Sequence, residues 1–281
     1  MTKYLALAVV TRYWKPNENY LGQIVAALGG KLQDGDFVIV SEKALAIAMG
    51  CIVDEAGVRP SCNARFIAGF WMRVVWGYCL GFMCGFGMRL LRRLREYPLE
   101  SGSRHKQIAL EYAGLFGALM FGSEGGIDGS NLAYSYVSLP LSNIAGVAQK
   151  IHSYIQEVLG KNVCIIIADT DKTFCFRNFY FTPRPNPIQG IHSGGGVVSY
   201  VLGRFLGLKR SSTPLASAGC LLLAEQALMV TNIADRTRGP GSGATVWDMA
   251  SRFHVEVDMV SWGMLDLISH KPLVIVRKKQ C

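Results

Sequence analysis

Three short runs of uninterrupted apolar residues constrain the fold of this chain more than any other feature. They span residues 37–40, 163–167 and 273–276. A strand with one face in water alternates apolar and polar residues, whereas an uninterrupted apolar strand is buried on both faces. Apolar residues at helical spacing lie between these runs, for example over residues 144–158. The sequence therefore predicts a mixed α/β (α+β) protein whose sheets are covered by helices.

Length and composition bound the number of domains and the class of partner. The chain has 281 residues, 50% of them hydrophobic and 17% charged, so it can bury enough apolar surface to fold as a globular protein. We expect one domain over residues 1–281, with two sub-lobes as an alternative and an apolar, basic insertion at residues 62–105. The formal net charge of +9 favours polyanionic partners such as nucleotides or acidic lipid. Nucleic acid is not expected, because no basic motif with interleaved aromatic residues is present.

An apolar segment at residues 66–86 allows three interpretations. It is long enough to span a bilayer and contains one charged residue, Arg73. Four arginines follow it, as expected on the cytoplasmic side of a spanning helix. They are Arg89, Arg92, Arg93 and Arg95. The interpretations are a protein-buried or dimer-interface pair of helices, attachment to a membrane surface through residues 66–95, and a spanning helix. The glycines expected to break a buried helix pair stand at positions 77, 81, 85 and 87.

The eight cysteines show none of the spacings that mark a metal site or a redox motif, because no two of them form C-x-x-C. Free thiols in a reducing cytosol are therefore preferred over a disulfide framework. The first ten residues lack the basic start and the long apolar core of a secretory signal. We expect a cytoplasmic protein, with peripheral membrane association as the alternative.

Two aspartates stand in settings typical of a ligand site. Asp128 lies in the glycine-rich stretch 122–131, and Asp169 follows the apolar run 163–167 with Thr170 beside it. Ligands of open sheets gather beyond the carboxyl ends of the strands. Two carboxylates and a hydroxyl are hard oxygen ligands that suit Mg²⁺ or Mn²⁺ carrying phosphates. The alternative for each aspartate is a turn residue that caps the next segment.

Two cationic elements are candidates for holding phosphate groups. Lys43 lies just after a predicted strand, and Arg236 and Arg238 precede the glycine-rich loop 239–243. That loop and the glycines at 194–196 each lead into a helical pattern, where backbone N–H groups can bind an anion. An ordinary loop is the alternative for each glycine run. Neither a P-loop nor a dinucleotide-binding motif is present.

The histidines and several local segments carry further expectations. None of the five histidines is assigned as a general base. His105, between two basic residues, is a candidate anion contact, and His152 is expected in solvent on an amphipathic helix that Ser142 can cap. We expect residues 100–106 to form a polar connection between helices and residues 184–188, with two prolines, to form a loop.

Five short motifs, in order along the chain, resemble those of a known family, the coenzyme F420-0:L-glutamate ligases. They are K-P-N-E-N-Y at 15–20, a strand followed by S-E-K at 41–43, D-G-S-N at 128–131, an apolar strand followed by D-T at 169–170, and a proline before an apolar strand and arginine at 272–277. No single motif is highly specific, but the order of all five is.

The resemblance implies an enzyme that joins an acid to an amino acid through an amide bond. It implies GTP as co-substrate, L-glutamate or another amino acid, an acid acceptor, an acyl-phosphate intermediate and an intertwined homodimer. It also implies two divalent ions, Mg²⁺ or Mn²⁺, with K⁺ as a further ion. The implied metal ligands are Asp128, Asp169, Thr170 and Asp266. The implied nucleotide contacts are Thr11, Arg12, Tyr13, Trp14, Ser41, Lys43 and Asn131.

Two departures from the family pattern keep other functions open. A second lysine and a glutamate that follow the S-x-K motif in the family correspond to Ile47 and Met49 here. One alternative is therefore a catalytically inactive relative that binds a nucleotide or a cofactor-like ligand. The other is a membrane-surface protein whose apolar segment docks on anionic lipid.

Overall fold

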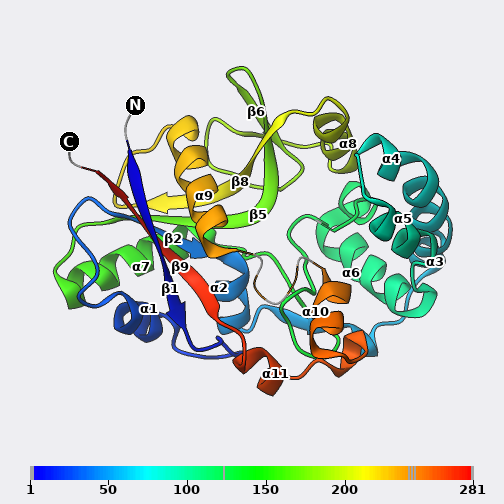
Figure 1. Ribbon diagram of the computed structural model, residues 1–281, viewed down its shortest axis with the longest axis horizontal. Coiled ribbons are helices and arrows are strands. Elements are labelled where there is room, and N and C mark those ends of the chain that lie inside the picture. The colour runs from blue at the N-terminus through cyan, green and yellow to red at the C-terminus, as the bar shows by residue number, and fades with distance from the viewer. Residues whose placement is uncertain (1–2, 123, 240, 242, 244, 280–281) are drawn as a thin grey trace.

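The structure is a computed structural model that describes residues 3–122, 124–239, 241, 243 and 245–279. A mixed sheet forms its centre, in the order β1-β9-β2-β5-β6-β7, with β8 paired to the other edge of β5 (Figure 1). The strands are β1 (Tyr4–Thr11), β2 (Phe37–Ser41), β5 (Cys164–Phe176), β6 (Phe179–Thr182), β7 (His192–Ser193), β8 (Lys209–Ala218) and β9 (His270–Lys278). The pair β2–β5 is parallel, whereas β9 runs antiparallel to β2 and β1. The predicted mixed α/β fold is confirmed.

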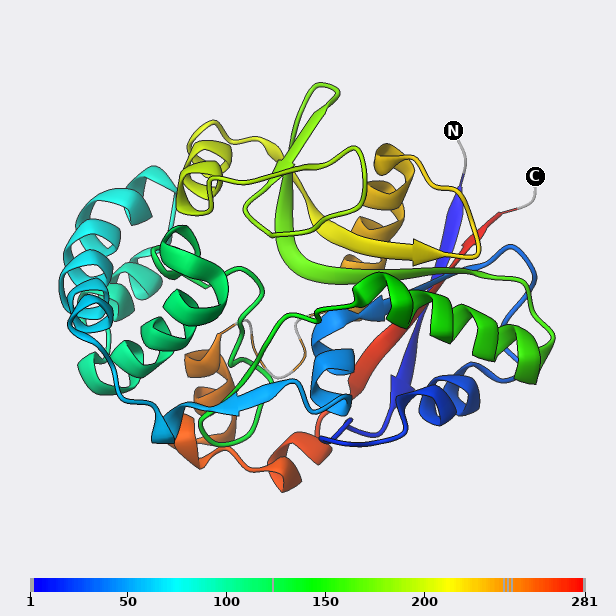
Figure 2. The ribbon, with the colours of Figure 1, turned by 180° about the vertical axis from the view of Figure 1, so that it is seen from behind.

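Helices cover both faces of the sheet, which explains the uninterrupted apolar runs. Alternate residues of β2 and β5, such as Val38 and Ile165, pack on one side with α1 (Tyr20–Leu28), α2 (Glu42–Ala48) and α7 (Ile144–Leu159). The residues between them, such as Ile39 and Ile166, pack on the other side with α9 (Ala224–Arg238). Figure 1 shows α9 on the near face, and Figure 2 shows α7 and α2 on the opposite face.

The boundaries of α7 agree with the predicted helix except at its cap. The cap is Asn143 rather than Ser142, and its side chain accepts a hydrogen bond from the Gly146 N–H. Gly160 ends the helix in the left-handed conformation, at φ 63°. His152 on this helix is half-buried, with Nδ1 3.0 Å from the Val163 carbonyl oxygen, so the expectation of a solvated histidine is wrong.

The predicted insertion forms a group of helices at the end of the molecule away from α1, which we call the helical lobe (Figure 1). Its elements are α3 (Cys62–Phe66), the π-helical η2 (Ile67–Leu80), α4 (Gly81–Met83), α5 (Met88–Arg95) and α6 (Leu99–Ala118). Residues Cys62–Met83 form one helix long and apolar enough to cross a membrane, but 33% of its most apolar window is buried in the protein. The polar segment 100–106, predicted to be a connection, belongs to α6 instead.

Two of the four glycines predicted to break the apolar helix do so, and two do not. Gly77 and Gly81 lie within continuous helix, where they allow α5 to approach closely. The chain leaves the helix at Gly85, at φ 66°, and extended backbone at Gly87 precedes α5. Met72 and Trp76 face the protein and are fully buried. The predicted burial in the protein therefore holds for one side of this helix, and the other side is exposed.

Short elements complete the described chain. The strands β3 (Ile52–Asp54) and β4 (Tyr136–Ser138) form a separate antiparallel pair. The remaining helical elements are η1 (Glu55–Gly57), α8 (Val197–Phe205), α10 (Val246–Phe253), η3 (Val257–Met259) and α11 (Trp262–Asp266). Helices α8 and α10 follow the glycine runs at 194–196 and 239–243, as predicted, and residues 184–188 lack helix or strand. Pro240 and Ser242, in the second run, are outside the described residues.

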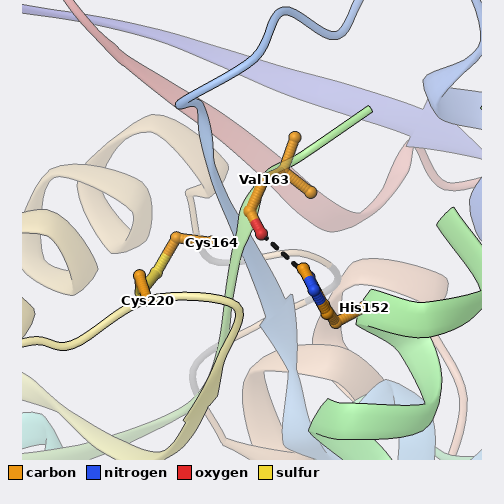
Figure 3. The surroundings of a disulfide bond; sticks show 4 residues. All are labelled: His152, Val163, Cys164 and Cys220. Atoms are coloured by element: carbon orange, nitrogen blue, oxygen red, sulfur yellow. Dashed lines mark hydrogen bonds between the residues drawn. A yellow bond between two sulfur atoms is a disulfide. The ribbon is translucent and has the colours of Figure 1, made fainter. Parts of the chain in front are cut away.

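One pair of cysteines corrects the expectation of free thiols. Cys164 at the start of β5 and Cys220 after β8 are joined by a disulfide across a Cα–Cα distance of 5.3 Å (Figure 3). The antiparallel pairing of β5 with β8 brings these residues together from 56 positions apart. The cysteines that remain free in the described chain are Cys51, Cys62, Cys79, Cys84 and Cys175. Cys281 lies outside the described residues.

Candidate functional site

A cavity of about 510 Å³ opens where β2 ends and α2 begins. Its walls come from segments far apart in the sequence, including the loop before β4, the middle of β5, the end of α9 and the start of β9. The predicted site residues that line it are Tyr13, Ser41, Lys43, Asp128, Asn131, Asp169 and Thr170. Seven of the eleven predicted site residues are thus brought together in one place.

Asp128 is held by the element that carries Lys43. The Lys43 ammonium donates to the Asp128 carboxylate and, over 2.9 Å, to the Ser130 hydroxyl. The other carboxylate oxygen of Asp128 accepts the Ser130 N–H at 2.6 Å. Backbone hydrogen bonds to Ser138 tie Asp128 to β4. The acidic loop is therefore fixed to both α2 and β4.

Asp169 does not stand at the end of a strand, contrary to the prediction. Strand β5 continues to Phe176, and its pairing with β8 shifts register between Asp169 and Lys172. Such a bulge re-aims side chains. Asp169, Thr170 and Asp171 all line the cavity. The irregular pairing of β5 with β8 thus places polar residues in the cavity, where the end of a strand was expected to place them.

Arg184 is a residue of this region that sequence reasoning missed. Its guanidinium donates to both oxygens of Glu42 at 2.7 Å and to Asp169 at 2.8 Å, and all three side chains are nearly buried. Burial raises the pKa of Glu42, and the charge of Arg184 opposes that rise. Arg184 lies in the predicted proline-rich loop, and nothing in that stretch marks it as different from a surface arginine. It couples the start of α2 to the bulge of β5.

Arg238 brings a largely buried positive charge to the cavity wall. Its Nε and Nη2 atoms are buried and have no hydrogen-bond partner among the described residues. Burial lowers its pKa, although the nearby charges of Asp235 and Asp169 oppose that shift. Lys172, by contrast, is paired with Asp235 at 3.0 Å. Arg236, the other predicted phosphate contact of this helix, is exposed and does not line the cavity.

Tyr13 and His270 line the cavity as neutral groups. The buried Tyr13 hydroxyl donates to the Asn131 carbonyl oxygen, and burial, with the nearby Asp128 charge, raises its pKa. Burial lowers the pKa of His270 to about 4. The rings of Tyr13 and His270 lie 4.5 Å apart, centroid to centroid. Near neutral pH the Tyr13 phenol therefore stays protonated and the His270 imidazole stays uncharged.

Four predicted site residues do not line this cavity. Arg12 is largely exposed and pairs with Glu18, Trp14 is fully buried in the core, and Asp266 pairs with Lys15 at 2.8 Å. The Thr11 hydroxyl oxygen lies 3.1 Å from Nδ1 of His270, which lines the cavity, but Thr11 itself does not line it.

His105 was predicted to contact an anionic ligand, but it pairs with the protein's own carboxylates. Its Nδ1 lies 2.5 Å from Glu55 and its Nε2 lies 3.5 Å from Glu124. Burial alone would lower the pKa of His105, but these two charges raise it to about 10. Glu124 also pairs with the fully buried Lys106 at 2.6 Å. This buried network joins α6 to the loop that carries Asp128.

The donor set suits a divalent ion that arrives with phosphates rather than a preformed protein cage. Within the described residues, no group of three histidine, cysteine, aspartate or glutamate side chains could hold a metal. Asp128 and Asp169 line the same cavity with the Thr170 hydroxyl, although each carboxylate also has a cationic partner. Mg²⁺ is commonly held by one or two carboxylates and the oxygens of a substrate phosphate. These residues fit that arrangement.

Two comparisons with known proteins bear on this cavity. A sequence model of the family described as F420-0:Gamma-glutamyl ligase matches residues 9–193. A protein of Methanocaldococcus jannaschii, described as "Uncharacterized protein MJ1361", is 33% identical over 287 residues, which cover 98% of this chain and 97% of that protein. The matched region contains Asp128, Asp169 and Arg184, whereas Arg238 lies beyond it.

Proposed function

Since the chain belongs to the F420-0:gamma-glutamyl ligase family, we propose that it joins an acid to an amino acid through an amide bond, with a nucleoside triphosphate as phosphoryl donor. Membership of a ligase family carries the coarse activity. GTP as the nucleotide, L-glutamate as the amino acid, K⁺ as a further ion, a homodimer and a cytoplasmic location are parts of the proposal that come from the resemblance.

The observation that carries the proposal is the set of charges in one cavity. Carboxylates, cations and neutral donors line a volume within the usual range for small-molecule sites. Lys43 and Arg238 can face phosphate oxygens, since both reach the same cavity from different elements. Asp128 and Asp169 would hold a divalent ion, which neutralises phosphate charge when bound.

The chemistry proceeds in two steps that need no covalent protein nucleophile. A carboxylate oxygen of the acid attacks the terminal phosphorus, and the nucleoside diphosphate leaves. The amine nitrogen of the amino acid then attacks the acyl carbon, loses a proton, and phosphate leaves. The chain's own residues bind and orient the reactants, and their fixed charges stabilise the charge that builds up during transfer. Arg184 keeps Asp169 aligned with α2 during these steps.

A thermal-shift screen with GTP, ATP, GDP and ADP, with and without Mg²⁺ or Mn²⁺, tests the nucleotide part of this proposal. A nucleotide at a hundred times its dissociation constant should raise the melting temperature by about 5 to 10 °C. Asp128→Asn should lose the part of the shift that needs the metal. Glu157→Gln, an exposed carboxylate on α7, is the matched control and should keep the full shift. Absence of any shift in the wild-type protein would contradict the proposal.

An inactive nucleotide-binding relative is the second candidate. The ion pairs of Asp128 with Lys43 and of Asp169 with Arg184 favour it, because both carboxylates already have cationic partners. Release of phosphate that requires both an acid and an amino acid would exclude this candidate. Nucleotide binding without turnover over a panel of acids would instead support it.

A further inference from the structure

One helix of the helical lobe presents apolar side chains to the solvent along its whole length. Every fourth residue from position 66 to position 82 is between 45 and 61% exposed. These residues, which we call the apolar stripe, are Phe66, Phe70, Val74, Tyr78 and Phe82. Single exposed apolar residues are ordinary, but a continuous row of large ones marks an interaction surface.

The other side of the same helix is fixed to the protein. Met72 and Trp76 are fully buried, and the Trp76 indole donates to the Leu119 carbonyl oxygen at 2.8 Å. Arg73 donates to the Tyr97 carbonyl oxygen at 2.8 Å. A spanning helix would have to break these contacts and expose α6. The stripe is therefore a surface of a folded lobe, and the helix does not need to leave that lobe for the stripe to make contact.

Positive charge lies directly beside the stripe. The Arg95 guanidinium is 4.3 Å from the centroid of the Tyr78 ring and 5.8 Å from that of Phe82. Arg89 and Arg92 are exposed on the same helix, α5. Residues 62–105 contain seven arginines against two glutamates. The surface thus combines aromatic side chains with a local excess of cations.

We propose that the apolar stripe and the arginines of α5 dock the helical lobe on an anionic membrane surface. Aromatic and aliphatic side chains enter the interfacial region of a bilayer, while neighbouring arginines contact acidic headgroups. A second copy of this chain fits less well, because two such faces would bring arginines against arginines. This inference stands independently of the proposed ligase activity, which uses residues outside the helical lobe.

Cosedimentation with vesicles tests the apolar part of the proposal. The full-length protein should sediment with phosphatidylcholine vesicles that contain phosphatidylglycerol. The double variant Phe70→Ser with Tyr78→Ser should partition about a hundredfold more weakly, since each large apolar side chain contributes about a tenfold factor when buried. The control variant Leu5→Ser with Leu7→Ser removes equally exposed apolar residues from β1 and should bind as the wild type does. Melting temperatures of both variants establish that the fold is kept.

A charge series tests the electrostatic part. Arg89→Gln with Arg92→Gln should weaken binding about tenfold or more, and about 0.5 M salt should do the same. Arg236→Gln, an exposed arginine of α9, should have little effect. No sedimentation of the wild type at low salt would overturn the proposal, as would binding that neither double variant reduces. A wild-type dimer that the stripe variant converts to monomer, without vesicle binding, would assign the face to self-association instead.

Discussion

At the scale of single residues, Arg184 ties together two elements that contribute to the cavity wall. Its guanidinium reaches carboxylates on two elements, Glu42 of α2 and Asp169 of β5, and all three groups are nearly out of solvent. A buried carboxylate anion that loses its cationic partner destabilises the folded state. The same arginine fills the space over Gly126, where a Cβ atom would lie 2.4 Å from its Cζ.

Replacing Arg184 should therefore destabilise the protein strongly. Arg184→Met leaves the Glu42 carboxylate buried without its partner, and we expect the free energy of unfolding to fall by about 3 to 5 kcal/mol. Urea denaturation followed by circular dichroism measures the change. Arg236→Met, at an exposed position of α9, should shift the free energy by less than about 0.5 kcal/mol.

A second substitution separates lost charge pairing from lost packing. Adding Glu42→Gln to Arg184→Met removes the stranded charge, so the double variant should be more stable than the sum of the two single effects predicts. Strict additivity of the two substitutions would show that the pair is not energetically coupled.

Single residues also mark how far sequence reasoning reaches into the site. Lys43, Asp128 and Asp169 could be predicted as cavity residues, because Lys43 follows a strand end, Asp128 lies in a glycine-rich stretch and Asp169 follows the apolar run 163–167. Arg184 could not, because its partner Glu42 lies 142 positions away and the pairing exists only once α2 and β5 are packed. The roles of Lys43, Asp128 and Asp169 as nucleotide and metal contacts stay predictions.

At the scale of the elements, the π-helical segment depends on glycines at its contact with α5. A Cβ atom on Gly81 would lie 2.5 Å from Leu91 Cδ2 and 2.6 Å from the Trp76 carbonyl oxygen. The sequence predicts a helix break at this glycine, since glycine weakens an isolated helix. In the fold it is instead the residue that permits close packing, and that role depends on a neighbouring helix that a local pattern does not describe.

The two roles of glycine predict opposite effects on stability. Gly81→Ala should lower the free energy of unfolding by about 1 to 3 kcal/mol, because the methyl group overpacks the contact. Gly69→Ala, on the same helix, would meet nothing nearer than Leu99 at 3.4 Å and should be neutral or stabilising by up to about 1 kcal/mol. Urea denaturation of the two variants compares them directly. Equal or greater stability of Gly81→Ala would refute the packing role.

At the scale of the whole molecule, the layered sheet could be predicted and the connections across it could not. The apolar runs predict β2, β5 and β9, because a strand that is buried on both faces needs an apolar residue at nearly every position. The disulfide of Cys164 with Cys220 and the network around His105 arise from long-range packing, and the sequence presents their members as isolated residues.

Two buried histidines with opposite pKa shifts should set the pH dependence of folding. Glu55 and Glu124 raise the pKa of His105 to about 10, although burial opposes them, so the folded state holds this proton more tightly than the unfolded state does. The resulting stability is complete below the ordinary pKa of about 6.5 and is lost as pH rises through 10. Burial lowers the pKa of His270 to about 4, so the folded state loses stability as pH falls from about 6.5 toward 4.

The free energy of unfolding should therefore be greatest near pH 6.5 and should decline on either side by about 1 kcal/mol per pH unit. Urea denaturation at a series of pH values measures this curve. His105→Gln should be less stable overall but should flatten the curve between pH 6.5 and about 8.5, below the range where buried thiols such as Cys84 add their own dependence on pH. His270→Asn should flatten the side between pH 4 and 6.5, because an amide cannot be protonated in the unfolded chain. His192→Gln, at an exposed position, should leave the shape of the curve unchanged. If both sides keep their slopes in the first two variants, the ion pairs of His105 and the burial of His270 do not control the pH dependence of the fold.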